Sequence, residues 1–353
     1  MRIAEVAPLF ESVPPKYYGG TERVVAYLTE ELVRQGHRVT LFASGDSATS
    51  AELVSPCREA LRLSKHFTDW MPHHLVMLEQ LFRRRGDFDV VHFHLDALHF
   101  PFARRAHLPN VTTLHGRLDI PDLVPLFREY REMQVVSISN SQRRPLPWLP
   151  WLATVHHGLP ENLYPLQERP QPYLAFLGRI SKEKRVDRAI HIAERVGLKL
   201  KIAAKIDKSD REYFDSMKRL FRRPLVEYVG ELGEKEKHDF LGNALALLFP
   251  IEWPEPFGLV LIEAMACGTP TVAYLQGAVP EIITDGVTGY VVRTVEGAVN
   301  AVNRIGELDR RRCRRMFEQY FTAARMARDY LSVFSVLLGE PAHPLHLAKQ
   351  SVS

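Results

Sequence analysis

EWPEPFGLVLIEAMACGTPTVAYLQGAVPEIITDGVTG, residues 252–289, is the stretch from which the fold can be inferred. Pro254 and Pro256 keep its first part extended, because a residue that precedes proline avoids the helical region. The apolar run over residues 259–266 is typical of a buried helix, and Gly268 is placed to end it. Residues 271–274, TVAY, have the β-branched character of a strand. The stretch therefore predicts a loop, a helix and a strand in that order.

This largely apolar stretch contains two carboxylates, which packing in a hydrophobic core does not explain. Glu255 lies at the mouth of the predicted helix, and Glu263 lies eight residues further on, inside it. The first helical turn, near residues 257–260, has backbone N–H groups without intrahelical partners, and these favour an anion such as phosphate. One carboxylate could bind hydroxyl groups beside the phosphate, and the other could bind a second polyol. A sugar joined through phosphates to a ribose satisfies both requirements.

The same residues carry a family resemblance. Glu255 and Glu263, with Pro256-Phe257-Gly258 between them and Gly268-Thr269-Pro270 after them, resemble the E-x7-E motif of retaining glycosyltransferases of the GT4 (group 1) type. That resemblance implies the α/β GT-B fold, in which two Rossmann-like domains face each other across a cleft and a C-terminal helix crosses back to the first domain. The expected parts are an acceptor domain at 1–165, a donor domain at 172–325, the crossover helix at 326–338 and a tail at 339–353.

Length and composition agree with two globular domains. A chain of 353 residues exceeds what one hydrophobic core usually serves. Its 46% hydrophobic and 25% charged residues are ordinary for globular proteins, and the net charge is only +4. Pairs and triplets of arginine are scattered along the chain, either on solvated faces or as attraction for an anionic substrate or membrane surface. We expect no nucleic-acid partner.

The cysteines and the N-terminal residues predict a cytoplasmic location. Cys57, Cys267 and Cys313 are odd in number and lack metal-ligand or CxxC spacing, which favours a reducing compartment. The first residues are strand-like and reach Glu5 too early for a signal peptide. No run approaches the ~18 apolar residues that a membrane span needs. Peripheral contact with the cytoplasmic face of a membrane remains open.

A βαβ unit with a glycine pair is expected at the start of the chain. Residues 2–8 are strand-like, a loop with Gly19 and Gly20 follows, and a helix leads to a second strand at 38–42. Such glycines let the backbone approach a phosphate or sugar closely, although a plain tight turn is the alternative. There is no G-x-G-x-x-G pattern, which weighs against a dinucleotide cofactor. We expect no cofactor beyond a nucleotide-sugar co-substrate.

His115 is the candidate for contact with the transferred sugar. It ends the strand at residues 111–116, where ligand-binding loops emerge from a parallel sheet. The T-x-H-G segment resembles the GT4 position whose histidine lies against the donor sugar near the reacting carbon. Asp119 could point into the same crevice.

Other polar residues of the first half have weaker assignments. His92 and His94 alternate on one strand and so face the same side. They either border the cleft with Asp96 or are satisfied core histidines. Asp87 and Asp89 form a D-x-D triplet, which we interpret as the polar lead-in to that strand and not as a metal site.

The second half begins with a strand at 173–177, followed by Gly178-Arg179 and Lys184. A helix N-terminus with two cations suits a diphosphate, Arg179 through its planar fork of donors and Lys184 as a point charge. The segment resembles the GT4 G-R-x-x-x-E-K-G motif, whose cations neutralise the donor pyrophosphate. Arg185 replaces the usual glycine, so the backbone conformation at this position could differ from that of the motif. By the same resemblance, the loop at Gly230 would border the nucleotide base.

The resemblance implies a metal-independent, retaining hexosyltransferase that uses a UDP- or GDP-sugar and an acceptor hydroxyl. The acceptor would be a sugar, a lipid-linked molecule or a small molecule. The residues assigned to catalysis are His115, Arg179, Lys184 and Glu255. Those assigned to the donor are Gly19, Gly20, Gly178, Arg179, Lys184, Gly230, Pro256, Phe257, Gly258, Leu259, Val260 and Glu263. Those assigned to the acceptor are Lys16, Tyr17, Asp96 and Asp119.

Two other functions are compatible with these motifs. A GT-B sugar-nucleotide epimerase would convert a donor without an acceptor. A non-catalytic protein could bind nucleotide sugars on a retained fold, although both motif carboxylates, Arg179 and Lys184 argue against lost chemistry. Nucleotide release that depends on an acceptor would distinguish transfer from both.

Overall fold

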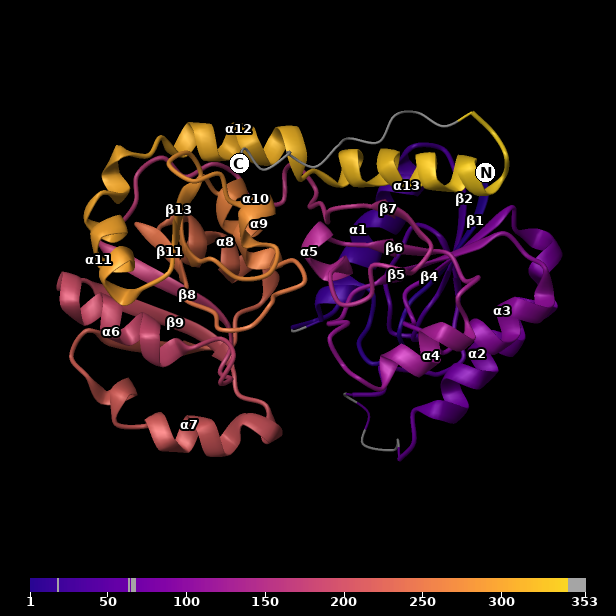
Figure 1. Ribbon diagram of the computed structural model, residues 1–353, viewed down its shortest axis with the longest axis horizontal. Coiled ribbons are helices and arrows are strands. Elements are labelled where there is room, and N and C mark those ends of the chain that lie inside the picture. The colour runs from indigo at the N-terminus through magenta and orange to yellow at the C-terminus, as the bar shows by residue number, and fades with distance from the viewer. Residues whose placement is uncertain (18, 63, 65–67, 342–353) are drawn as a thin grey trace. The chain divides into compact units, whose positions relative to one another are not determined.

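The computed structural model describes residues 1–17, 19–62, 64 and 68–341, and the chain forms two compact units. Among the described residues, the first unit contains Met1–Pro160 and residues 323–341, and the second contains Glu161–Thr322 (Figure 1). Residues 342–353 of the predicted tail lie outside the described residues. The prediction of two Rossmann-like α/β units is confirmed by the sheets described below.

The first unit is built on a seven-stranded sheet in which all neighbouring strands are parallel. Its order is β3-β2-β1-β4-β5-β6-β7. The strands are β1 (Arg2–Val6), β2 (Arg38–Phe42), β3 (Glu52–Val54), β4 (Val90–Phe93), β5 (Asn110–Leu114), β6 (Val135–Ser137) and β7 (Trp151–Thr154). The order reverses between β1 and β4, and ligands of open α/β sheets bind beyond the carboxyl ends of strands at such a reversal.

Helices cover this sheet and bury its apolar residues. They are α1 (Gly20–Arg34), α2 (Met71–Arg83), α3 (Phe100–Ala106), α4 (Leu123–Glu129), α5 (Asn140–Arg143) and α13 (Ala323–Leu337), with a 3-10 turn, η1, at Arg85–Asp87. Helix α13 packs against α1 in this unit although it follows the second unit in sequence (Figure 1). The core contains Phe42 and Phe93 in one cluster and Phe100 and Phe127 in another.

The second unit has a six-stranded parallel sheet in the order β10-β9-β8-β11-β12-β13. The strands are β8 (Tyr173–Arg179), β9 (Lys199–Lys205), β10 (Val226–Gly230), β11 (Ala246–Phe249), β12 (Thr271–Tyr274) and β13 (Gly289–Val292). Here the order reverses between β8 and β11. The two predicted donor segments follow these two strands, so the fold brings their loops to one edge of the sheet.

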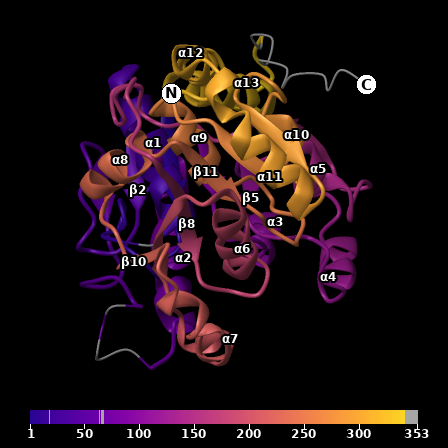
Figure 2. The same cartoon turned by 90° about the vertical axis from the view of Figure 1, so that its left-hand side faces the viewer.

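The helices of the second unit lie on both faces of its sheet. They are α6 (Val186–Val196), α7 (Arg211–Met217), α8 (Glu234–Gly242), α9 (Leu259–Ala266), α10 (Val279–Ile282), α11 (Val295–Asn303) and α12 (Arg310–Tyr320), with 3-10 turns η2 (Lys208–Asp210), η3 (Leu220–Arg222) and η4 (Ile305–Glu307). Helices α6 and α11 pack side by side (Figure 2), whereas α9 packs against α8 and α12. None of the described helices is both long enough and apolar enough to cross a membrane.

Helix α9 has the ends that its sequence predicts. Gly258 caps its N-terminus with φ 93°, in the left-handed region that glycine adopts easily. Gly268 follows its C-terminus with φ 79°, and the N–H groups of Gly268 and Thr269 donate to the carbonyl oxygens of Met265 and Ala264 at 3.0 and 2.8 Å. The predicted stop at Gly268 is confirmed.

Candidate functional site

An ion pair between Lys184 and Glu255 joins the two predicted donor segments. Lys184 lies in the loop between β8 and α6, and Glu255 lies between β11 and α9. Only 18% and 12% of these two side chains are exposed. The Lys184 ammonium also lies 5.5 Å and 5.2 Å from the ring centroids of Phe249 and Trp253, where cation–π attraction adds to the ion pair. The site therefore places a fixed positive charge beside a fixed carboxylate.

The main chain of Glu255 is held by a third segment. The N–H of Ala278 donates to the Glu255 carbonyl oxygen at 2.9 Å. Gly277 has φ 53°, and a Cβ built there would lie 2.3 Å from Glu255 O and 2.4 Å from Glu255 N. In addition, the N–H of Glu252 donates to the Glu183 carbonyl oxygen at 2.9 Å, which ties the two donor loops together. The approach of residue 277 thus sets the position of the catalytic candidate Glu255.

Arg179 ends β8 among three carboxylates. Its guanidinium is ion-paired with Glu183, its Nε lies 3.2 Å from an oxygen of Asp210, and its Nη1 lies 3.8 Å from one of Asp207. Burial raises the pKa of Glu183, but hydrogen bonds from the backbone and from Arg179 more than offset it, so that the pKa falls below its ordinary value. An incoming diphosphate would compete with these acids for Arg179.

Arg185, which stands where the GT4 motif has glycine, adopts a left-handed backbone conformation. Its φ of 53° and ψ of 52° lie in the left-handed region, which costs a residue with a Cβ roughly 1–2 kcal/mol. The guanidinium is ion-paired with Asp187 at 2.9 Å and with Glu252. These pairs offset the backbone strain, so the departure from the GT4 motif leaves the turn before α6 intact.

The N-terminus of α9 is shaped as an anion site. Pro256, Phe257 and Gly258 are buried, and the first helical residues, Leu259 and Val260, are half-buried. The Phe257 ring packs edge-on against Phe321 at 6.4 Å between ring centroids. The N–H groups of the first turn and the helix dipole are directed toward the loop that carries Glu255. This arrangement suits a phosphate group.

Glu263 lies inside α9 in a second ion-paired cluster. Its side chain is 4% exposed, and Oε1 lies 3.2 Å from the Lys237 ammonium, which is also 3.7 Å from Glu234. Tyr164 donates a hydrogen bond to Glu234. Burial raises the pKa of Glu234 to about 7; Lys237 lowers it and Glu263 raises it. Lys237 therefore supplies the charge that permits Glu263 to be buried.

The glycines assigned to the donor stand at strand and helix ends. Gly178 precedes Arg179 at the end of β8, and Gly230 ends β10 with φ 86°. Gly20 is the first residue of α1, and Gly19 is its N-cap. A Cβ at Gly19 would lie 2.8 Å from Pro15 Cβ, so the β1–α1 loop requires a glycine there.

The residues assigned to the acceptor lie on three loops of the first unit, after β1, β4 and β5. The Lys16 side chain is 60% exposed and 3.9 Å from Asp46, and Tyr17 is 55% exposed. Asp96 is exposed with φ 49°. Asp119 is ion-paired with Arg117 at 2.6 Å on the surface. Because β1, β4 and β5 are neighbours, the three loops share one edge of the sheet.

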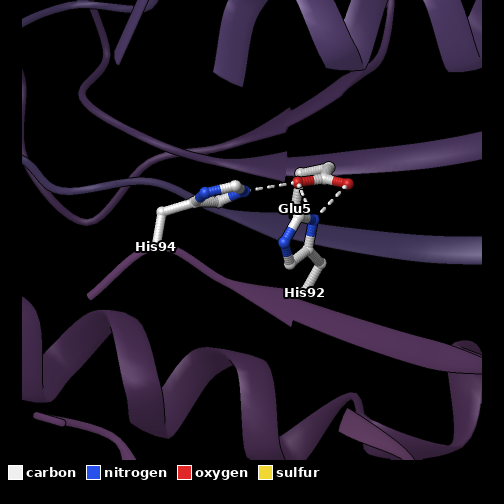
Figure 3. Close-up of side chains that lie close together, drawn as sticks. All are labelled: Glu5, His92 and His94. Atoms are coloured by element: carbon white, nitrogen blue, oxygen red, sulfur yellow. Dashed lines mark hydrogen bonds and ion pairs between the residues drawn. The ribbon is translucent and has the colours of Figure 1, made fainter. Parts of the chain in front are cut away.

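His115 is one end of a hydrogen-bonded series that continues into the core (Figure 3 shows its inner part). The half-buried His115 has Nε2 2.8 Å from His94 Nδ1, and His94 Nε2 lies 2.9 Å from Glu5 Oε2. The same Glu5 oxygen lies 3.1 Å from His92 Nδ1. Glu5, His92 and His94 are almost completely buried. Burial lowers the pKa of His92 and of His94 to about 3, so both rings are neutral.

A second branch of this network reaches α13. His92 Nε2 lies 2.7 Å from Thr113 Oγ1, which lies 2.9 Å from the Tyr330 hydroxyl. The helix that returns to the first unit is therefore hydrogen-bonded to the strands that carry His115.

Two features bear on metal binding. The ligand atoms of Glu5, His92 and His94 lie within 4.8 Å of one another, as a metal site requires, but each already has a hydrogen-bond partner within the network. Asp87 and Asp89 of the D-x-D triplet are ion-paired with Arg84 at 3.0 Å and Arg2 at 2.7 Å. Both aspartates are thus engaged by arginine where β4 begins.

Sequence reasoning did not single out Glu5 or Lys237 for these positions, and it noted Gly277 only as the first residue of a segment similar to the GT4 G-x-x-P-E pattern. Glu5 offered a signal, because a carboxylate within an apolar strand of a parallel sheet needs a buried partner. Helix α8, EKEKHDFLG, is so rich in charge that nothing in the sequence distinguishes Lys237.

Comparison with known proteins agrees with this geometry. The family model described as "Glycosyltransferase Family 4" matches residues 18–200, and that of "Glycosyl transferases group 1" matches residues 165–320. An uncharacterised glycosyltransferase of Methanocaldococcus jannaschii is 25% identical over 81% of this chain and 84% of its own. Glycogen synthase of Mycobacterium tuberculosis is 27% identical over 83% of both chains.

Solved structures share the fold. AviGT4, a glycosyltransferase involved in avilamycin A biosynthesis, has a TM-score of 0.72 at 24% identity, covering 98% of this chain and 100% of its own. HepE from Anabaena, solved with UDP and glucose, has a TM-score of 0.74 at 15% identity, covering 95% and 100%. Because the matched segments run from residue 18 to residue 320 and include every donor motif described above, the chain belongs to the group 1 glycosyltransferases, glycosyltransferase family 4.

Proposed function

We propose that this glycosyltransferase moves a hexose from a nucleoside-diphosphate sugar to an acceptor hydroxyl, with retention of configuration and without a metal ion. The observation that carries the proposal is the ion pair of Lys184 with Glu255 at the N-terminus of α9. It combines a cation and free amides for the diphosphate with a carboxylate for sugar hydroxyls.

In the proposed reaction, the bond between the anomeric carbon and the diphosphate breaks while the acceptor oxygen bonds to that carbon on the same face. The acceptor proton passes to a phosphate oxygen of the leaving group. Lys184, Arg179 and the amides beyond Gly258 stabilise the negative charge that develops there, and preorganised donors of this kind contribute about 3–4 kcal/mol each. Because the acceptor oxygen bonds to the anomeric carbon directly on the face that the diphosphate leaves, no covalent nucleophile is assigned, and the leaving diphosphate serves as the base.

The remaining roles follow the family resemblance. Glu263 is assigned to the ribose and Glu255 to the hydroxyl groups of the transferred sugar. His115 is assigned to that sugar near its reacting carbon, and the loops with Lys16, Tyr17, Asp96 and Asp119 to the acceptor. Relatives named as glycosyltransferases and synthases favour transfer over epimerisation. We further propose a cytoplasmic enzyme whose acceptor is a sugar, a lipid-linked molecule or a small molecule.

The test is a panel of UDP-, GDP- and ADP-sugars in the presence of EDTA, with nucleotide release measured with and without candidate acceptors. UDP-glucose is the first donor to try, because HepE was also solved with it. Release of one nucleoside diphosphate that rises with an acceptor, and an anomeric configuration that matches the donor by NMR, are expected. Tight donor binding without turnover on any acceptor, or release that EDTA abolishes, would contradict the proposal.

A further inference from the structure

The contacts of His115 leave one ring nitrogen for a ligand. Nε2 is engaged by His94 at 2.8 Å, and the ring stacks on His157 with 5.3 Å between centroids and 18° between planes. Nδ1 has no hydrogen-bond partner among the residues that the structure describes. Any polar contact of His115 with a substrate is therefore made through Nδ1, and its character depends on which nitrogen carries the proton.

The proton positions along the series are coupled. A Glu5 carboxylate accepts N–H groups from His92 Nδ1 and His94 Nε2. A neutral imidazole carries one proton, so His94 Nδ1 is then bare and accepts the Nε2–H of His115. In the opposite arrangement, a proton on Glu5 is donated to His94 Nε2, His94 Nδ1–H donates to His115, and the His115 proton moves to Nδ1. A substrate would thus meet an acceptor in the first case and a donor in the second.

Burial raises the pKa of Glu5, and the hydrogen bond and charge of His94 oppose this. The geometry favours the first arrangement, because both oxygens of Glu5 face ring nitrogens: Oε2 lies 2.9 Å from His94 Nε2, and His92 Nδ1 lies 3.1 Å from Oε2 and 3.2 Å from Oε1, as expected for a carboxylate that accepts N–H groups. The other end is consistent, because Tyr330 can donate to Thr113 and Thr113 to His92 Nε2, which leaves the His92 proton on Nδ1 toward Glu5.

We propose that Glu5 and His94 are positioning residues that lock His115 as its Nε2–H tautomer, so that Nδ1 is presented as a hydrogen-bond acceptor for a hydroxyl of the substrate. The inference rests on the proposed function for the identity of that substrate. The lock itself is a property of the ligand-free protein. A buried carboxylate that fixes the tautomer of a functional histidine is an established device in enzymes.

The first experiment needs no substrate. Long-range 1H–15N correlation spectra of the 15N-histidine-labelled full chain report the tautomer of each neutral ring. We expect the His115 proton on Nε2, and we expect it to leave Nε2 in Glu5→Gln, because the introduced amide can donate to His94 Nε2. In His94→Phe, which keeps a buried ring without nitrogens, the proton loses its acceptor and should no longer be confined to Nε2. Tyr330→Phe is the control: it removes a hydroxyl at the far end of the network and should leave the His115 tautomer unchanged.

The second experiment uses the transfer assay. Glu5→Gln and His94→Phe should each lower kcat/KM about 10- to 100-fold, and Tyr330→Phe less than about twofold. Glu5→Gln combined with His115→Ala should be no worse than His115→Ala alone, because Glu5 acts through His115. A merely structural role of Glu5 would instead give additive losses.

Three results would overturn the inference: a wild-type His115 proton on Nδ1, a tautomer that neither Glu5→Gln nor His94→Phe changes, or a metal ion that co-purifies one per chain and shifts the His92 and His94 signals when chelated. If no donor and acceptor pair supports transfer, the proposed function fails, while the spectra still decide whether the lock exists.

Discussion

The Lys184–Glu255 site in the second unit and the Glu5–His94–His115 series in the first unit differ in where their polar side chains lie and in how deeply these are buried. The first joins two loops, with both side chains partly exposed, and each loop is a recognisable motif. The second joins β1, β4 and the end of β5, and its inner members are almost completely buried. The difference teaches that chemistry on loops can be found from local sequence, whereas a buried polar network depends on the register of strands far apart in the chain.

The register is what assembles the first-unit network. Glu5 of β1 lies opposite His92 of β4, and His92 lies opposite Val111 of β5. Side chains two residues apart share a face of a strand, so His94 lies beside His92, and Thr113 and His115 follow Val111 on the same face. A shift of one residue between β1 and β4 would remove Glu5 from both histidines.

The largest expected effect tests the loop site through its cation. Lys184→Ala should lower kcat/KM about 10²- to 10³-fold, because it removes a preorganised donor to the leaving diphosphate and leaves Glu255 without its ion pair. Steady-state transfer kinetics measure this. Lys182→Ala, an exposed lysine of the same loop, is the matched control and should change kcat/KM less than about twofold. Equal effects of the two substitutions would show that Lys184 contributes only as a general positive surface charge and not through its position beside Glu255.

The second prediction asks whether the loop site also depends on tertiary contact. Gly277→Ala should lower the free energy of unfolding by about 3–4 kcal/mol and impair transfer, because the new Cβ would lie 2.3 Å from the Glu255 carbonyl oxygen at a positive φ. Urea denaturation measures the stability. Gly286→Ala is the control, since Gly286 also has a positive φ but nothing within 4 Å of its Cβ position, and it should cost about 1 kcal/mol. A Gly277→Ala loss no greater than that of the control would show that the close approach is unimportant.

The third prediction concerns a buried carboxylate beside the glycine pair of the first unit. Burial raises the pKa of Glu22 to about 7, and the nearby Glu11 raises it further while Arg62 opposes this. The folded protein binds the Glu22 proton more tightly than the unfolded chain, whose pKa is 4.5, and protonation of Glu22 therefore stabilises the fold. This contribution to the free energy of unfolding is complete below pH 4.5 and is lost as the pH rises through 7. Its size over that window is about 2–3 kcal/mol.

Urea denaturation between pH 4.5 and 8 is the measurement for Glu22. The free energy of unfolding of the wild-type protein relative to that of Glu22→Gln should fall by about 2–3 kcal/mol over this range, because the amide does not ionise. The difference between the wild type and Glu234→Gln, where burial also raises the carboxyl pKa to about 7, should fall over the same range independently. Profiles that match the wild type in both variants would mean that neither carboxyl is neutral in the folded protein.

The smallest expected effect tests the left-handed residue of the loop site. Arg185→Gly should change the free energy of unfolding by less than about 1 kcal/mol, because relief of the strain at φ 53° offsets the loss of the pairs with Asp187 and Glu252. Arg185→Ala, which keeps the strain and loses the pairs, should be less stable than Arg185→Gly. The reverse order in thermal or urea unfolding would contradict the offset.

Particular residues show how far prediction from sequence reached. The ends of α9 and the strand at Thr271–Tyr274 follow from local patterns, because proline, glycine and β-branched residues act within a few positions of themselves. The two α/β units were inferred from the chain length and the family resemblance. Lys184 and Glu255 were both assigned to catalysis, but their ion pair was not predicted. Lys237 was not assigned, and Gly277 was noted only as the first residue of a segment similar to the family's G-x-x-P-E pattern, because the partners of both residues are distant in sequence.

The sequence by itself determined the architecture and the donor motifs, since turns, helix caps and hydrophobic periodicity depend on residues that are close together in the chain. Only the tertiary structure decided which carboxylate each cation meets, how closely Gly277 approaches Glu255, and that Glu5 joins His92, His94 and His115 in one hydrogen-bonded series. The physical reason is that a hydrogen bond or ion pair needs atoms within a few ångströms. Strand register and loop closure set those separations, and neither is fixed by the residues of one segment.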